Sequence, residues 1–272
     1  MRRWSRLFLI VFLLIGIMLL LCSGTLSEDK ALWPQTGKNV KKNGKLQLDV
    51  SYTQDGYFMA AVQKQNKHKL KLRITKGKET LSYDLNSNAE YEIFPLQLGS
   101  GKYAVTLYEN VSGKKYSQQG KINLTVKLSR EDAAFLRPNQ YVNYTQLSEA
   151  VAEANRQCEG KNEKEAYKII CGFMKSHFIY DYIKAATVKA GTLPDIDGSF
   201  AKKAGICQDL SAIMVCMLRT QGIPSRLMIG YADKQYHAWV TTTVEKKEEF
   251  FDPTAAINSI SNVKTYTTER YY

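Results

Sequence analysis

The chain changes its hydrophobic period near residue 138. Before that point, short apolar runs alternate with polar residues in a period of two, as in Lys69-Leu70-Lys71-Leu72-Arg73-Ile74, which is typical of half-buried β-strands. Turn signals such as Asp55-Gly56 and Ser112-Gly113 separate these runs. The predicted strands are 45–52, 56–62, 69–75, 80–85, 91–96, 102–108 and 121–128. About seven short strands of this kind predict an all-β sandwich of the immunoglobulin or fibronectin type over residues 37–128.

After Pro138 the apolar residues recur with a helical period of about 3.6. Two stripes predict helices around 147–154 and 166–178, and the residues from Pro194 to Gly198 break the helical pattern. A third stripe predicts a helix that ends at Gly222; its members are Leu210, Ile213, Met214, Met217 and Leu218. Strands are predicted at 226–231 and 236–244, so residues 138–272 read as a second domain of mixed helices and strands.

Three residues of this second domain have the chemistry of a nucleophile, a base and an orienting group. Cys207 lies in the first turn of the third predicted helix, where free N–H groups and the helix dipole attract negative charge. His237 lies on the strand 236–244, and Asp252 follows the next apolar run. Most domains contain a Cys, a His and an Asp, so their spacing alone is only moderately specific.

The sequence around these residues resembles the transglutaminase-like superfamily of papain-type Cys-His-Asp enzymes. The matching segments are GICQDLSAIMVCMLRTQGIPSRLMIGYAD, YHAWV and FFDPT, in that order and spacing, within residues of about 140 to 257. The resemblance implies an α+β, papain-like fold. It also implies that Cys207 is the nucleophile, His237 the general base and later acid, and Asp252 the group that orients the imidazole. The developing oxyanion needs two donors; the Cys207 N–H is one candidate, and Tyr180 and Tyr182 are candidates for the other.

By this resemblance the protein acts on amide bonds of protein or peptide substrates through a thioester acyl-enzyme. Water as the acceptor gives a cysteine protease or amidase, whereas an amine gives a cross-linking transglutaminase, and the same three residues serve both. We favour hydrolysis, because the chain has no calcium loop of the kind that animal transglutaminases use. No cofactor and no metal site are expected. The alternative to an enzyme is a catalytically silent binding or scaffold protein at the cell surface.

The N-terminus predicts export. Arg2, Arg3 and Arg6 precede an unbroken apolar run from Leu7 to Cys22, and small polar residues follow this run. The pattern is typical of a signal peptide or an N-terminal membrane anchor over residues 1–28. We therefore expect an extracellular or cell-surface location.

Charge divides the chain at the same place as the hydrophobic period. The 272 residues carry a formal net charge of +12. Residues 37–127 hold 16 Lys and Arg against 7 Asp and Glu, whereas residues 129–272 hold 18 against 17. For an exported protein, an anionic cell-wall polymer or lipid headgroups fit this basic domain, and nucleic acid does not. Lysines that only keep strand edges soluble explain the same pattern.

Four of the five cysteines follow the N-terminal segment; they are Cys158, Cys171, Cys207 and Cys216. A catalytic Cys207 must be a free thiol, which leaves at most one disulfide among the other three. We expect free thiols at all four positions.

Overall fold

The structure is a computed structural model that describes residues 36–272. The signal peptide or anchor predicted over residues 1–28 lies outside the described residues. Among the described helices, none is long and apolar enough to cross a membrane. The described residues belong to one compact unit.

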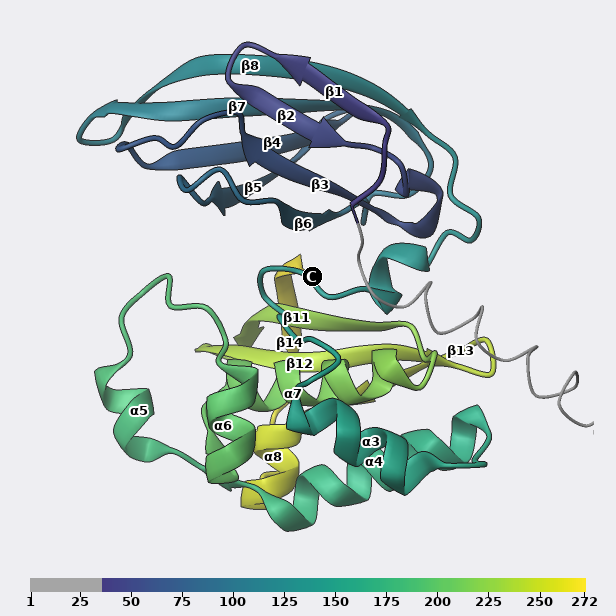
Figure 1. The fold of residues 1–272 in the computed structure, drawn as a ribbon. Coiled ribbons are helices and arrows are strands. Elements are labelled where there is room, and N and C mark those ends of the chain that lie inside the picture. Colours follow the sequence, from purple (N-terminus) through teal and green to yellow (C-terminus); the bar gives the residue numbers. More distant parts are fainter. Residues whose placement is uncertain (1–35) are drawn as a thin grey trace, which may run out of the picture. The chain divides into compact units, whose positions relative to one another are not determined.

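The first part of the described chain is built from strands (Figure 1). Its strands form two four-stranded antiparallel sheets, with the orders β1-β2-β3-β6 and β5-β4-β7-β8. Besides the short 3-10 helix η2 (Thr53–Asp55), its elements are β1 (Val40–Asn43), β2 (Leu46–Asp49), β3 (Tyr57–Val62), β4 (Leu70–Lys76), β5 (Glu79–Leu85), β6 (Glu92–Pro95), β7 (Gly101–Ser112) and β8 (Lys115–Val126).

The seven predicted strands are confirmed, with shifted ends. In β4 the alternation places Leu70, Leu72 and Ile74 in the interior, as the period of two predicts. The sequence pattern missed β1, because all four of its residues are exposed and show no apolar face. It also ended one strand early, because β7 continues to Ser112 and turns at Gly113, whose φ of +51° suits glycine. The immunoglobulin or fibronectin type, and the domain boundaries, stay predictions.

The second part of the described chain mixes helices with one larger sheet. The sheet has the order β13-β12-β11-β14 and is antiparallel throughout. The elements are η3 (Ala133–Leu136), α3 (Glu149–Cys158), α4 (Glu163–His177), β9 (Ile179–Tyr180), α5 (Tyr182–Thr187), α6 (Ile196–Lys202), β10 (Ala204–Gly205), α7 (Cys207–Thr220), β11 (Ser225–Ala232), β12 (Gln235–Val244), β13 (Lys247–Phe251), α8 (Pro253–Asn258) and β14 (Tyr266–Tyr271).

Helix α7 is the centre of this part. It contacts β11 and β12 of the sheet, and it also contacts α3, α4, α6 and α8 (Figure 1). Every residue of its predicted apolar stripe is fully buried; these residues are Leu210, Ile213, Met214, Met217 and Leu218. Burial of a Leu or Met side chain stabilises a fold by about 1.5–3 kcal/mol. Because α7 is surrounded by other elements, its first residue, Cys207, has a fixed position in the fold.

Two details of the sequence prediction are wrong. The residues from Pro194 to Gly198 do not end a helical region; α6 begins there, because the Asp195 carboxylate caps it by accepting the Gly198 N–H at 2.9 Å. The first stripe also starts too early, since Leu147 is 93% exposed and α3 begins only at Glu149. Helix α5 and strand β14 had no sequence prediction.

Candidate active site

The nucleophile candidate is held at the beginning of α7 by a close backbone packing. Gly205 lies two residues before Cys207, and a Cβ added to it would lie 2.9 Å from the Cβ of Asp209. Only glycine fits this approach without movement of its neighbours. Cys207 is the first residue of α7 and is partly exposed, so a substrate can reach its thiol.

The base candidate connects the other two predicted residues. His237 lies on β12, and its Nε2 is 2.8 Å from the Asp252 Oδ2. Its side chain is only 11% exposed. The Cys207 side chain lies close enough to this imidazole to contribute to the raised pKa of His237. Because Nε2 faces Asp252, Nδ1 is the ring nitrogen that remains for the thiol. The structure therefore brings the side chains of Cys207, His237 and Asp252 together, with His237 between the other two.

Asp252 is fixed by its position at a helix start. Asp252 directly follows β13 and caps α8, where Pro253 takes the first helical position. Its Oδ1 accepts the Ala255 N–H at 3.0 Å, so its Oδ2 remains for His237. The Asp-Pro-Thr segment thus orients the carboxylate through ordinary capping of a helix.

The charges of His237 and Asp252 stabilise each other. Burial lowers the pKa of His237, but hydrogen bonds and charge from Asp252 and Cys207 outweigh burial and raise it to about 9. Burial raises the pKa of Asp252, yet the His237 hydrogen bond and charge outweigh that effect and lower it overall. An ionised Asp252 beside a protonated imidazole is therefore the favoured state at neutral pH.

A fourth side chain, which the sequence did not indicate, contacts this group of three residues. Tyr266 of β14 donates its hydroxyl to the Asp252 Oδ2 at 2.8 Å, the same oxygen that faces His237. Its ring also packs edge-on against Trp239 at 5.0 Å between centroids. Gly230 permits β14 to lie this close, because a Cβ there would be 2.0 Å from the Thr267 carbonyl oxygen. No motif marks Tyr266, so only the fold could reveal it.

The two tyrosines predicted as oxyanion donors lie differently. Both line a cleft of about 480 Å³, and His237 and Asp252 line the same cleft. Tyr180 lies on β9, which pairs with β10 so that Tyr180 is opposite Gly205. Burial, with the nearby Cys207 and other groups, raises the pKa of Tyr180 to about 12, so its hydroxyl stays a donor. Tyr182 is 69% exposed, and its hydroxyl donates to the Asn258 Oδ1 at 3.2 Å.

The four cysteines of the described chain are free thiols in this structure. Within residues 36–272, no group of three or more His, Cys, Asp or Glu side chains is arranged to hold a metal ion.

Comparison with known proteins gives the family of this region. The model of the transglutaminase-like superfamily matches residues 151–251. A candidate cysteine protease of known structure from Cytophaga hutchinsonii is 16% identical, with a TM-score of 0.39, over 73% of this chain and 71% of its own. A candidate protease from Parabacteroides distasonis is 19% identical, with a TM-score of 0.36, over 56% and 37%. Red sea bream transglutaminase is 14% identical, with a TM-score of 0.32, over 78% and 50%. No curated protein sequence matches the chain.

The chain therefore contains a transglutaminase-like domain at residues 151–251. The match includes Cys207 and His237 and ends directly before Asp252. The resemblance predicted from the three sequence segments is confirmed at the level of the superfamily.

Proposed function

We propose that this protein is an exported enzyme that cleaves amide bonds of protein or peptide substrates through a thioester on Cys207. One observation carries the proposal: the side chains of Cys207 and Asp252 both act on the His237 imidazole, and the Asp252 Oδ2 is 2.8 Å from the His237 Nε2. A thiol, an imidazole and a carboxylate in this order are the groups that nucleophilic acyl transfer requires.

In the first half of the reaction, the Cys207 sulfur attacks the substrate carbonyl carbon and the C–N bond breaks. The imidazolium of His237 gives its Nδ1 proton to the leaving amine, which departs as a neutral product. In the second half, neutral His237 takes a proton from water, the water oxygen attacks the thioester, and the thiolate leaves. Asp252 keeps the ring in one orientation through both halves and stabilises its charged form.

The oxyanion of each tetrahedral intermediate requires donors that are in place beforehand. The N–H groups at the beginning of α7 have no helical acceptor, and the Cys207 N–H is the nearest of them to the thiol. Tyr180 is the better second donor, since it lies opposite Gly205 and lines the cleft. Tyr182 already donates to Asn258, so we assign it to the wall of the cleft.

The acyl acceptor distinguishes the enzyme classes, and one assay separates them. The full chain is incubated with a generic protein substrate and a fluorescent primary amine. Cleavage without incorporation of the amine supports the proposed hydrolase. Incorporation of the amine identifies a transglutaminase instead, and absence of both products favours a binding or scaffold protein.

The role of Cys207 is tested separately with iodoacetamide at neutral pH. We expect rapid alkylation of one thiol in the native protein and its loss in Cys207→Ala. Burial raises the pKa of Cys171 to about 11 and also raises the pKa of Cys216, so both thiols should react slowly. Cys216→Ala serves as the matched control and should keep the rapid phase. Equal labelling of wild type and Cys207→Ala contradicts the assignment.

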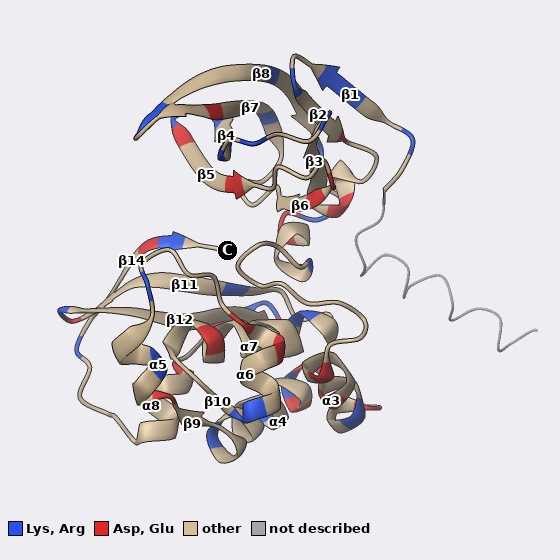
Figure 2. Cartoon of the chain, turned by 60° about the vertical axis from the view of Figure 1, so that its left-hand side comes forward, with Lys and Arg blue, Asp and Glu red and all other residues tan. Residues whose placement is uncertain are grey.

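We also propose that the basic sheets of the first part bind an anionic cell-wall polymer. Lys and Arg residues lie along β1 and at the turn between β7 and β8 (Figure 2), and Lys41 and Lys42 of β1 are exposed. Retention on immobilised teichoic acid should fall from low to moderate salt, and fall further in Lys41→Glu/Lys42→Glu. Retention that does not change with the salt concentration contradicts an electrostatic contact.

A further inference from the structure

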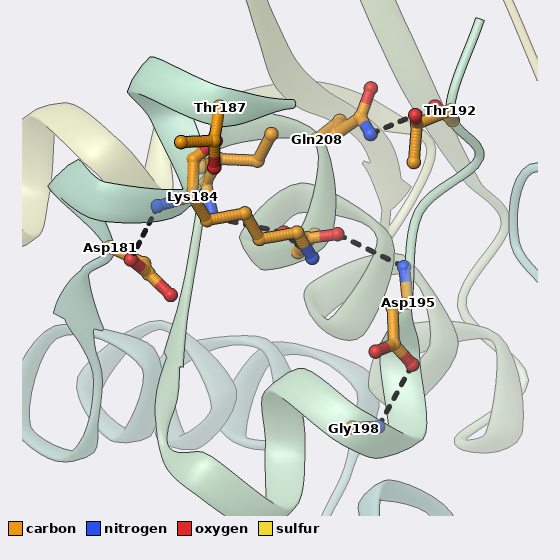
Figure 3. Close-up of polar contacts among 9 residues, drawn as sticks. Asp181, Lys184, Thr187, Thr192, Asp195, Gly198 and Gln208 are labelled. Atoms are coloured by element: carbon orange, nitrogen blue, oxygen red, sulfur yellow. Dashed lines mark hydrogen bonds and ion pairs between the residues drawn. The ribbon is translucent and has the colours of Figure 1, made fainter. Parts of the chain in front are cut away.

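Helix α5 lies beside the candidate active site without an apolar anchor. None of its six residues is buried, although it begins two residues after Tyr180. Most short helices are stable only where a face packs against the fold. Polar contacts must therefore keep α5 in place, and Figure 3 shows those around its first turn.

The main contact is an ion pair with a buried carboxylate. The Lys184 Nζ of α5 lies 2.7 Å from the Asp209 Oδ2, and Asp209 is 0% exposed while Lys184 is 26% exposed. The start of α5 is also capped, because the Asp181 carboxylate accepts the Lys184 N–H at 2.8 Å. A carboxylate this deep in the fold is costly unless a cation and donors surround it.

Asp209 connects the same ion pair to the nucleophile helix. It is the third residue of α7, and its Oδ2 also accepts the N–H of Ile206, directly before Cys207, at 3.0 Å. Its Oδ1 accepts the Asp195 N–H at the start of α6, also at 3.0 Å. One side chain thus fixes the backbone before Cys207, the start of α6 and, through Lys184, helix α5.

A second contact supports the same attachment. The Gln208 side chain, next to Cys207, donates to the Thr192 carbonyl oxygen at 3.0 Å in the segment after α5 (Figure 3). The segment 186–193 is exposed throughout, so these polar contacts, and not a packed core, determine where it lies.

We propose that Lys184 and Asp209 are positioning residues that keep α5, and with it Tyr180 and Tyr182, along the cleft that His237 and Asp252 line. Asp181, the residue after Tyr180, caps α5, and its N–H bonds to the Gly205 carbonyl oxygen at 3.0 Å. Detachment of α5 therefore loosens Tyr180 relative to the thiol. The catalytic part of this inference rests on the proposed function, whereas the attachment of α5 does not.

The test compares Lys184→Met, which removes the cation but keeps most of the aliphatic chain, with Lys184→Arg, which keeps the charge. Lys189→Met is the matched control, because this lysine is exposed and no ion pair with it is seen among the described residues. Amide hydrogen exchange at Ala185 and Val188 is expected to accelerate about tenfold in Lys184→Met, since a lost buried ion pair favours local opening. Lys184→Arg is expected to restore slow exchange.

Turnover gives the second readout. In Lys184→Met, kcat should fall about tenfold with little change in KM, because a displaced oxyanion donor acts on the transition state. Exchange and kcat equal to those of Lys189→Met overturn the inference. If the wild-type protein shows no turnover, the proposed function fails, and the hydrogen-exchange result still decides whether Lys184 and Asp209 hold α5.

Discussion

Replacement of Asp252 by Asn tests the electrostatics of the site directly. The substitution keeps the size of the side chain and removes the negative charge 2.8 Å from the His237 Nε2. In the wild type, Asp252 and Cys207 together raise the pKa of His237 from its ordinary 6.5 to about 9. An opposite charge at this distance accounts for about 1–3 pKa units. We therefore expect the pKa of His237 to fall by about 2 units in Asp252→Asn, or about 3 kcal/mol of lost imidazolium stabilisation.

The titration can be followed one residue at a time, because the chain has only three histidines. Proton–carbon NMR of the ring Cε1–H groups between pH 5 and 10 gives each midpoint. The other two signals are assigned from their loss in His68→Gln and His177→Gln. A His237 midpoint in Asp252→Asn that stays within about half a unit of the wild-type value refutes the reasoning.

The same pKa shift predicts a dependence of stability on pH. The folded-state pKa of His237 is raised, so its contribution to stability is fully present below pH 6.5 and is lost as the pH rises through about 9. The difference in unfolding free energy between wild type and His237→Gln should include about 3 kcal/mol at pH 6 that is absent at pH 10. Urea unfolding at the two pH values measures it, and a difference independent of pH contradicts the shift.

Three further substitutions test single contacts. Tyr266→Phe removes the hydroxyl that bonds to Asp252, and kcat/KM should fall about tenfold in a peptidase assay; an unchanged value leaves Tyr266 without a positioning role. Arg219→Met removes a fully buried guanidinium that donates to the Ser225 and Tyr272 carbonyl oxygens, and urea unfolding should show a loss of about 3 kcal/mol. Asn162→Ala removes the capping box of α4 and should cost about 1 kcal/mol by the same measurement; no loss in either variant contradicts these contacts.

The elements that the sequence predicted correctly bury apolar residues at regular intervals. Helix α7 and the strand β4 have apolar residues at regular intervals, because burial selects those positions. The elements that it missed lack this signal. Strand β14 is exposed or half-buried along its whole length, and α5 has no buried residue. Their positions depend on partners elsewhere in the fold, so no local pattern could predict them.

The misinterpreted segment at Asp195 has a different cause. Pro194, Asp195, Asp197 and Gly198 are turn signals, but Asp is also a strong helix cap. The Asp195 side chain bonds to the Gly198 N–H and so starts α6. The same residues are compatible with either structure, and the decision comes from packing, since Ile196 and Phe200 of α6 are buried.

For the candidate site, the motifs indicated the three candidate catalytic residues but not the side chains that hold them in place. Cys207, His237 and Asp252 lie in three short segments whose order and spacing resemble one family pattern. The contact of Tyr266 with Asp252 joins β14 to the start of α8, and that of Lys184 with Asp209 joins α5 to α7. Each depends on a distance in space between residues that are far apart in sequence, which no motif encodes.

These contacts give two buried carboxylates the same double function. Asp252 caps α8 and faces the His237 imidazole, while Asp209 accepts an N–H at the start of α7 and faces the Lys184 ammonium. A helix start supplies N–H donors that lower the free-energy cost of burying a carboxylate, and the remaining oxygen lone pairs can then bind a cation. The positions of the base and of the cleft wall are therefore coupled to the ends of two helices. A substitution that removes either carboxylate should therefore disturb the start of a helix and the reactivity together, and Lys184→Met should likewise loosen α5 and lower kcat.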